Sequence, residues 1–259
     1  LTERGARLVM PERGSVACGA EGQGRLADVR EIYLAGINAR FPQDMAGMRV
    51  LLTLGPTREQ WDAVRFWSNP SSGVMGASLA VAAWLRGAEV DAVCGPGCPW
   101  LPSGIRRHDI TGARQMFDLA RALWPSMHCG MFTAAVADFS PEPYGREKFK
   151  KSGATEGFSI KFTPNPDILY TLATQRRPGQ KVVGFAAETA DDLGAAVRSK
   201  LRAKGADLVV GNRIGEEGAG FGAVTNAVHV ADATGREEQW PLMPKPEIAW
   251  RICSWLLQM

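Results

Sequence analysis

The sequence has little of what would place it among membrane, secreted or nucleic-acid-binding proteins. Its 30 basic side chains exceed its 27 acidic ones by only three, which is too small an excess to indicate a nucleic-acid partner. No apolar run reaches the roughly 18 to 20 residues that cross a bilayer, and the first residues do not open a basic and then apolar leader. We therefore expect a cytoplasmic protein with no membrane partner and no nucleic-acid partner.

Cysteine and histidine are also scarce. The five cysteines are an odd number and are scattered, so reduced thiols fit better than a disulfide framework. Cys94 and Cys98 are the one close pair in the sequence, and no second pair or suitably spaced histidine completes a zinc site with them. The three histidines are too widely separated to suggest a catalytic triad. We expect no metal site built from protein side chains.

The common nucleotide-binding fingerprints are absent after the first apolar run. Gly55-Pro56-Thr57-Arg58 is not a P-loop, because no Gly-Lys-Ser/Thr follows, and it is not the G-x-G-x-x-G motif of dinucleotide-binding sheets. A nicotinamide-dependent reductase stays the alternative enzyme on such a sheet, although it lacks the glycine fingerprint it needs.

From Met48 onward the sequence alternates short apolar runs with amphipathic stretches, which is typical of βαβ units and a mostly parallel sheet. Strands are predicted at 49–54, 89–94, 105–109, 129–136, 181–187 and 208–211, and helices at 75–86, 112–124 and 191–204. A hairpin over 227–231 and 238–241 and a helix over 244–258 follow. The predicted fold class is α/β: a doubly wound, mostly parallel, Rossmann-like sheet with a C-terminal hairpin and helix.

Three local features complete this outline. Residues 1–47 are rich in glycine and arginine and show little periodicity. Residues 138–157 combine prolines, glycines and basic side chains, which predicts a mobile loop. Ser71 and Ser72 are the predicted caps of the helix over 75–86, and Gly87 is its predicted terminator.

Two unusual segments follow predicted strands at their carboxyl ends, where open parallel sheets bind ligands. Residues 55–73 offer the amides of a helix N-terminus together with Arg58, Arg65 and Asn69, which suit an anion. Residues 134–138 offer small side chains and then the Asp138 carboxylate, which suits a sugar hydroxyl, a base or a metal. Each also has a plain structural interpretation, as a connecting loop and as a turn-capping aspartate.

A third segment, 147–151, carries three lysines that form either a cationic lid over a polyphosphate or a solvated charge run. In a fourth, Asn165 or Asp167 can start a helix, and Phe185 either stacks on a nucleobase or packs in the core. Lys200 and Lys204 share one helix face, as ligand cations or as a solvated stripe. Together the four segments indicate a nucleotide or another phosphate ligand.

The order of these motifs is that of phosphopantothenate–cysteine ligases: GPTREQWDAVRFWSNPSSGVMG, AAVADF, KFKK, NPDI, GFAAET, the Lys200 and Lys204 pair, and VGNRI. The chain resembles the bacterial type, which is usually fused behind a flavin-dependent phosphopantothenoylcysteine decarboxylase. The resemblance runs from Met48 to about Ala231.

This resemblance divides the chain into residues 1–47, the end of a decarboxylase domain with its linker, and residues 48–259, a ligase domain. Pro11–Gly19 and Gly22–Arg25 look like the decarboxylase's substrate clamp, in which Cys18 would be the proton donor of the decarboxylase half. The FMN-binding body is not in this sequence. The resemblance therefore implies FMN only for the absent domain, and no decarboxylation by this chain alone.

The reaction that the resemblance implies joins 4'-phosphopantothenate to L-cysteine. A carboxylate is a poor acylating agent, so CTP first forms an acyl-cytidylate with release of pyrophosphate, and the cysteine amine then displaces CMP. Both steps gather negative charge, which Mg²⁺ and fixed cations stabilise. By this resemblance the chain would form a homodimer in which one subunit helps to complete the other's site. Contacts through a decarboxylase domain would allow a larger oligomer.

Site residues carry over by resemblance as well. Lys148 would contact the triphosphate and support activation, Asn69 would bind the pantothenate moiety and support the second step, and Arg65 and Ala135 would line the acyl site. The implied nucleotide site comprises Phe132, Thr133, Ala134, Asp138, Lys148, Asn165, Asp167, Ile168, Phe185, Lys200 and Lys204.

One position departs from the family pattern, since Val74 stands where a lysine or arginine usually follows Ser-Ser-Gly. Arg58 or a lysine of the 147–151 segment is the expected substitute for that charge. The residues themselves leave CTP and ATP open. A non-catalytic nucleotide-sensing or scaffold module is the other interpretation, in which Lys148 and Asn69 would have no chemical role.

Overall fold

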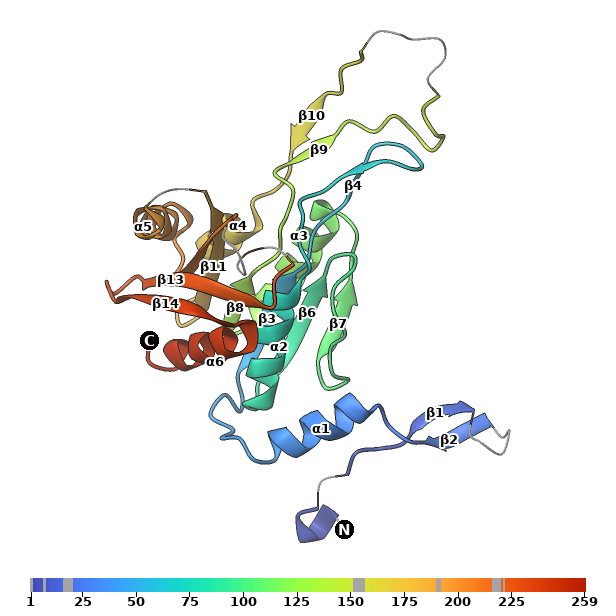
Figure 1. Cartoon of the computed structure of the whole chain (residues 1–259), viewed down its shortest axis with the longest axis vertical. Coiled ribbons are helices and arrows are strands. Elements are labelled where there is room, and N and C mark those ends of the chain that lie inside the picture. Colours follow the sequence, from blue (N-terminus) through green and yellow to red (C-terminus); the bar gives the residue numbers. More distant parts are fainter. Residues whose placement is uncertain are drawn as a thin grey trace.

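The structure is a computed structural model that describes residues 2–6, 8–15, 21–150, 157–189, 192–215, 220 and 222–259. Its centre is an eight-stranded sheet in the order β14-β13-β12-β11-β8-β3-β6-β7 (Figure 1). The strands are β3 Arg49–Leu54, β6 Glu89–Cys94, β7 Arg106–Asp109, β8 Cys129–Phe132, β11 Lys181–Glu188, β12 Leu208–Arg213, β13 Thr225–Asp232 and β14 Glu237–Pro244. All pairs from β12 to β7 are parallel, and β13 and β14 add an antiparallel edge.

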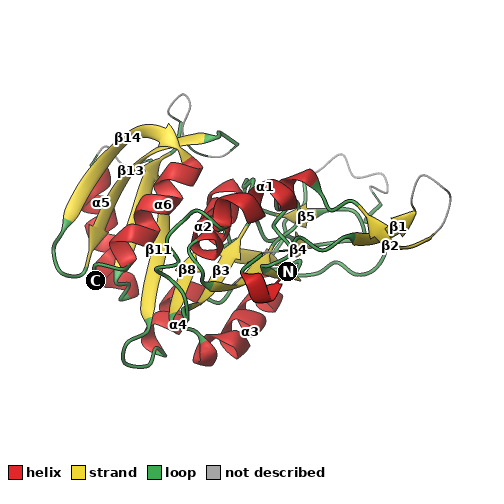
Figure 2. Ribbon diagram, turned by 90° about the horizontal axis from the view of Figure 1, so that it is seen from below, coloured by secondary structure: helices red, strands yellow, loops and turns green. Residues whose placement is uncertain are grey.

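Helices cover both faces of the sheet (Figure 2). One core layer contains the apolar sides of α2 (Val74–Leu85) and α6 (Lys245–Leu256). The other contains those of α3 (Ala113–Leu123), α4 (Ile168–Thr174) and α5 (Leu193–Lys204), with a short 3-10 turn at Trp124–Ser126. The predicted α/β, doubly wound class with its C-terminal hairpin and helix is confirmed.

The burial of the central strands explains why their positions could be predicted from the sequence. β3 and β6 are buried along their length apart from their first residues, because helices cover the sheet from both sides. Each was predicted to the residue. β7 and α3 lie within one residue of their predictions at each end.

Two local predictions were wrong. The strand predicted over 129–136 ends at Phe132, and the chain beyond it continues irregularly, with only an isolated bridge between Ala135 and Pro56. The serine caps are also wrong, because α2 has Gly73 as its N-cap, at a φ of 69° that favours glycine. Ser71 Oγ instead accepts a hydrogen bond from the Gly73 amide. Gly87 does follow the helix, at a φ of 93°.

The N-terminal segment, which showed little periodicity, contains defined elements. A 3-10 turn spans Thr2–Arg4, β1 (Glu12–Ser15) pairs antiparallel with β2 (Glu21–Arg25), and α1 covers Val29–Asn38. Asp28 caps α1 by accepting from the Arg30 amide at 2.8 Å. No residue of α1 is buried, which explains the weak apolar pattern.

A projecting arm stands away from the sheet at the top of Figure 1. We define the arm as residues 59–67, with β4 (Glu59–Gln60) and β5 (Phe66–Trp67), and residues 139–150 and 157–164, with β9 (Phe139–Pro141) and β10 (Phe162–Pro164). β9 and β10 pair at its base, so part of the predicted loop over 138–157 is strand. Within the described residues, no helix combines the length and apolarity needed to cross a membrane.

Gly76 provides a test of the packing that positions α2. A Cβ at this glycine would lie 2.4 Å from Leu54 Cβ and 2.4 Å from Thr133 Oγ1, so Gly76→Ala must push α2 away from β3. We expect a loss of about 1–3 kcal/mol in the free energy of unfolding, measured by urea denaturation. Gly36→Ala in α1 is the matched control, because its Cβ would meet nothing within 4 Å. Equal stability of Gly76→Ala and wild type would contradict the close approach.

Candidate functional site

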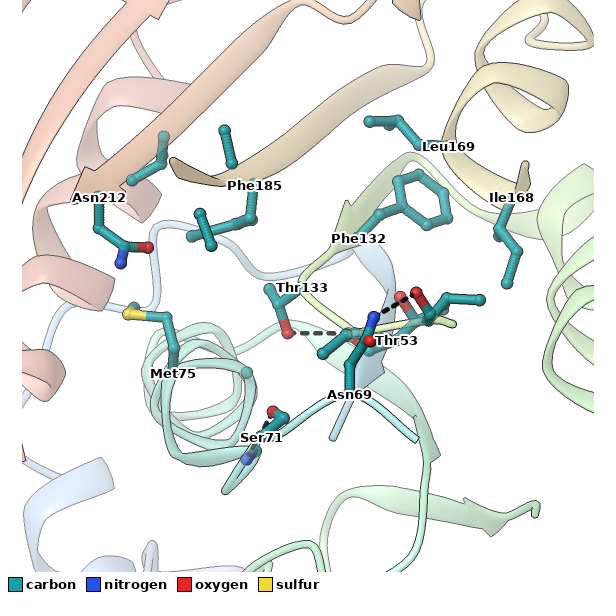
Figure 3. A pocket seen from close by; sticks show the side chains of 18 of the residues that line it. Thr53, Asn69, Ser71, Met75, Phe132, Thr133, Ile168, Leu169, Phe185 and Asn212 are labelled. Atoms are coloured by element: carbon teal, nitrogen blue, oxygen red, sulfur yellow. Dashed lines mark hydrogen bonds between the residues drawn. The ribbon is translucent and has the colours of Figure 1, made fainter. Parts of the chain in front are cut away.

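A cleft of about 830 Å³ opens at the carboxyl edge of the parallel strands (Figure 3). Its walls come from the chain after β3 and β8, the ends of β11 and β12, and the N-termini of α2 and α4. Twelve of the predicted site residues line it: Asn69, Phe132, Thr133, Ala134, Ala135, Asp138, Asn165, Asp167, Ile168, Phe185, Lys200 and Lys204. Segments separated by up to 135 positions in the sequence therefore meet at one site.

The floor of the cleft is held by main-chain contacts. Thr133 Oγ1 donates to the Thr53 carbonyl at 2.8 Å, and Asn69 Nδ2 donates to the Val136 carbonyl at 3.0 Å (Figure 3). The second bond ties the loop before α2 to the irregular segment after β8. It fixes the orientation of the Asn69 amide, so that its oxygen is a defined acceptor for a ligand.

A partly buried hydrogen-bond network supports the next wall. Asn165 Nδ2 donates to the Ala137 carbonyl at 2.7 Å, and its Oδ1 lies 2.6 Å from Ser140 Oγ. Ser140 Oγ is also 2.9 Å from Glu59 Oε2, while Glu59 Oε1 accepts from the Ala113 amide at 2.9 Å. Glu59 and Ser140 were not predicted. Because the partners of Glu59 and Ser140 are distant in the sequence, no local sequence pattern predicts that these two residues support the site.

Carboxylates and lysines share the α4 and α5 side of the cleft. Of the two predicted helix starts, Asp167 rather than Asn165 caps α4, by accepting from the Tyr170 amide at 2.9 Å. Asp167 also pairs with Lys204. Burial lowers the pKa of Lys200, while Glu188 acts against that shift. Asp138 is exposed at the opening. A phosphate or hydroxyl ligand would therefore find both cations and acceptors on this side.

The two aromatic residues of the site differ in their surroundings. The Phe132 ring lines the cleft but is largely buried, edge-on against Trp124 with centroids 6.2 Å apart, so little of its surface is open to a ligand. Phe185 is half-buried, and it both packs against the core and lines the cleft. The core and ligand interpretations of Phe185 are therefore compatible.

Three cationic residues expected at the site do not line the cleft of this chain. Arg65 pairs with Asp62 at 2.8 Å on the arm, and Arg58 lies over the Phe66 ring with 4.7 Å to its centroid. Lys148 is exposed on the arm. The arm carries Arg65 and Lys148 away from the sheet edge of their own chain, so their assignment to the acyl and nucleotide sites stays a prediction. Cys18 and Lys151 lie outside the described residues.

Asp62 is the anchor of the Lys148 segment. It is buried, and its carboxylate accepts from the amides of Val64, Arg65 and Phe149 at 2.7, 2.7 and 3.0 Å. Burial alone would raise the pKa of Asp62, but these bonds outweigh it and hold the pKa below its ordinary value. The segment next to Lys148 is thus bound to the loop that carries Arg65.

Aromatic packing strengthens this anchor. The Phe149 ring has its centroid 5.3 Å from that of Trp61 and 5.0 Å from that of Phe158. The Tyr144 amide donates to the Trp61 carbonyl at 2.7 Å. Lys148 therefore projects from an anchored segment rather than from a plain solvated loop.

The open sheet and the cleft at its strand ends define an α/β protein of the class that binds ligands at the carboxyl edge. The model of the "DNA/pantothenate metabolism flavoprotein C-terminal domain" family matches residues 45–259, so the chain belongs to this family.

Named relatives agree with this assignment. The coenzyme A biosynthesis bifunctional protein CoaBC of Bacillus subtilis (strain 168) is 35% identical over 257 residues, which is 97% of this chain but 62% of that protein. The chain thus spans less than two thirds of that relative's length. A cysteine/cysteine sulfinic acid decarboxylase from an unknown prokaryotic organism is 35% identical over 266 residues, covering 100% of this chain and 73% of that protein.

Solved structures show the same fold. The C-terminal domain of a coenzyme A biosynthesis bifunctional protein CoaBC superposes with a TM-score of 0.70 and 31% identity, covering 84% of this chain and 97% of that one. A Cab2 mutant in complex with phosphopantothenate-cysteine has a TM-score of 0.66 at 15% identity, covering 90% and 94%, and this likeness concerns the fold alone.

The Asp62 anchor can be tested by hydrogen exchange. Asp62→Asn should raise amide exchange at Phe149 by about tenfold or more, because a neutral amide accepts these bonds less strongly. The folded-state pKa of Asp62 is lowered, so its contribution is present above the unfolded pKa of about 3.9 and is lost as pH falls through the folded value. The difference between variant and wild type should therefore vanish in strong acid. Asp118→Asn, at an exposed position on α3, is the control.

Proposed function

We propose that the chain is a ligase that joins 4'-phosphopantothenate to L-cysteine, driven by CTP through an acyl-cytidylate, in coenzyme A biosynthesis. One observation carries this proposal: amide, carboxylate and lysine side chains from four separate motifs line a single cleft at the sheet's carboxyl edge. Family membership supports it, as do the names of the CoaBC relatives and the ligand of the Cab2 structure.

The chemistry matches the groups in the cleft. In the first step, a carboxylate oxygen of phosphopantothenate attacks the α-phosphorus of CTP, and the bond to pyrophosphate breaks. In the second, the cysteine nitrogen attacks the acyl carbon, CMP leaves with the bonding electrons, and the amine loses its proton. Lys200 and Lys204 supply fixed positive charge for the phosphates, and the α2 N-terminus supplies amide donors. Asn69 holds the acyl substrate.

Mg²⁺ fits this site as a partner of the nucleotide. The described residues contain no group of three or more His, Cys, Asp or Glu side chains that could hold a metal. Mg²⁺ commonly binds through substrate phosphates and one or two carboxylates. Asp138, exposed at the cleft, is the carboxylate in a position to contribute. When bound, Mg²⁺ would neutralise charge on the phosphates.

The arm supports a homodimer in the proposed enzyme. Phe66, Trp67 and Phe139 are 45%, 54% and 51% exposed on it, which is costly for three large apolar side chains in water. Pairing of two arms would bury these rings. It would also carry Lys148 and Arg65 toward the cleft of the partner, which accounts for their place outside their own cleft.

The remaining assignments concern the rest of the chain. We infer that residues 1–47 are the end of a decarboxylase domain with its linker, and that residues 48–259 are the ligase domain. FMN binding and the release of CO₂ from phosphopantothenoylcysteine would belong to a decarboxylase body, and residues 48–259 should show neither. A reductase would require a glycine fingerprint that the chain lacks.

Lys148 tests the activation step. Lys148→Gln should lower the rate of pyrophosphate release from CTP and phosphopantothenate by about 100-fold or more, because a cation facing the phosphates is removed. Lys161→Gln is the matched control, since Lys161 is an exposed lysine of the arm that pairs with Glu142. Its rate should stay within about twofold of wild type, a change too small to reflect a lost transition-state contact. Equal rates for Lys148→Gln and Lys161→Gln would remove Lys148 from the mechanism.

Asn69 tests the second step. Asn69→Ala should leave pyrophosphate release within a few-fold of wild type, while formation of phosphopantothenoylcysteine falls by about 100-fold, because the acyl group is no longer held for attack. Quenched samples should then contain accumulated acyl-cytidylate, measured by mass spectrometry. A parallel fall of both rates would place Asn69 in activation or in folding instead.

A further inference from the structure

Two helix N-termini open on the side of the cleft that lies away from Lys200 and Lys204. β14 runs in the same direction as β12, because both are antiparallel to β13, so β14 ends at the carboxyl edge and α6 begins there. α2 also begins at this edge, after β3. The two helices pack on the same face of the sheet, and both starting residues, Val74 and Lys245, line the cleft.

Lys245 is the cation at this end. It is the first residue of α6, its exposure is 3%, and its Nζ donates to the Gly220 carbonyl at 3.0 Å. Glu247, the acidic residue of the first turn of α6, is exposed and pairs with Arg251 at 2.8 Å. In the described part of the chain, no carboxylate pairs with Lys245.

This environment opposes a positive charge unless an anion is present. Burial lowers the pKa of Lys245. The amides at a helix N-terminus place further partial positive charge beside it. An ammonium carries three donors, and one carbonyl accepts from Lys245 among the described residues. An anion in the cleft would relieve both the desolvation and the repulsion.

The neighbouring groups are donors as well. α2 has no side-chain cap, so its first amides are available at the cleft, and its first residue, Val74, is uncharged. Asn212 from β12 and Met75 of α2 both line the cleft (Figure 3). At this end of the cleft, Lys245 therefore adds a positive charge to the hydrogen-bond donors of the α2 N-terminus and Asn212. The sequence motifs did not predict this group of donors.

We propose that Lys245 binds a phosphate group at this end of the cleft, together with the amides of the α2 N-terminus. The identity of the substrate rests on the proposed ligase function: the phosphate is either in the triphosphate of the nucleotide or the 4'-phosphate of phosphopantothenate. Val74 stands where the family pattern has a lysine or arginine. Lys245, rather than Arg58 or an arm lysine, would supply the positive charge that is missing at position 74.

Calorimetric titration with inorganic tripolyphosphate tests the site without turnover. Lys245→Met should weaken tripolyphosphate binding by about tenfold or more, which corresponds to about 1.4 kcal/mol, and Lys245→Arg should largely restore it. Lys181→Met is the matched control, since Lys181 is a half-buried lysine that donates to a carbonyl, Met259 O, at 3.4 Å, and it does not line the cleft. Binding by Lys245→Met equal to that of wild type would overturn the proposal.

Steady-state kinetics of the same variants distinguishes the two phosphates. A rise in KM confined to the nucleotide assigns Lys245 to the triphosphate, and a rise confined to phosphopantothenate assigns it to the 4'-phosphate. Unchanged KM values for both substrates would overturn a role in either. A wild-type chain that binds tripolyphosphate but forms no product would refute the ligase function and leave the phosphate site in place.

A third measurement covers the case in which Lys245→Met does not fold. In the wild-type chain, the pKa of Lys245 followed by NMR of its side chain should rise when tripolyphosphate is added, because the anion favours the ammonium form. A pKa that stays unchanged at saturation would show that Lys245 has only a structural contact with Gly220.

Discussion

The common direction of the strands from β12 to β7 is the constraint on which the site depends. Parallel pairing brings every one of these strands to an end at the same edge, and the segments that follow them must turn there. Polar and charged side chains that are far apart in the sequence therefore line one cleft. Asn69, Asp138 and Lys200 are examples, and no local motif connects them. The close contact of Gly76 with β3 then sets where α2 begins relative to this edge.

Charge is distributed unevenly along the cleft. On the α5 side, Lys204 already has the Asp167 carboxylate as partner, whereas Lys200 is half-buried. On the α6 side, Lys245 is buried with a carbonyl as its acceptor among the described residues. The paired lysine is stable without a ligand, while the buried one gains most from an anion. Affinity for phosphate would therefore depend more on burial than on the number of lysines.

The elements that could be predicted from the sequence are those that a local pattern of apolar residues defines. β3 and β6 were found to the residue because apolar side chains are needed on both of their faces. The predicted strand over 129–136 was too long, since the small apolar residues after Phe132 look the same whether they form a strand or an irregular ligand-facing turn. α1 was missed because its apolar residues are not buried. The cleft residues were predicted chiefly from the family resemblance.

Other parts of the site could not have been predicted from local pattern. Glu59 bonds to an amide 54 positions away, and Asp62 to one 87 positions away, so their roles exist only in the folded chain. Lys245 looks in sequence like an ordinary residue at the start of a helix, and only its burial distinguishes it. The place of Lys148 on the arm depends equally on tertiary contacts.

The Asp62 anchor also has a consequence for the proposed ligase. A flexible segment that closes over a substrate loses conformational freedom with every turnover, and this loss weakens binding. Here Phe149, the residue after Lys148, is held in the folded chain by the Asp62 carboxylate and by a cluster of aromatic rings. If Lys148 serves the nucleotide site of a partner subunit, as proposed above, its approach would depend on how the two subunits are arranged more than on the closure of a free loop.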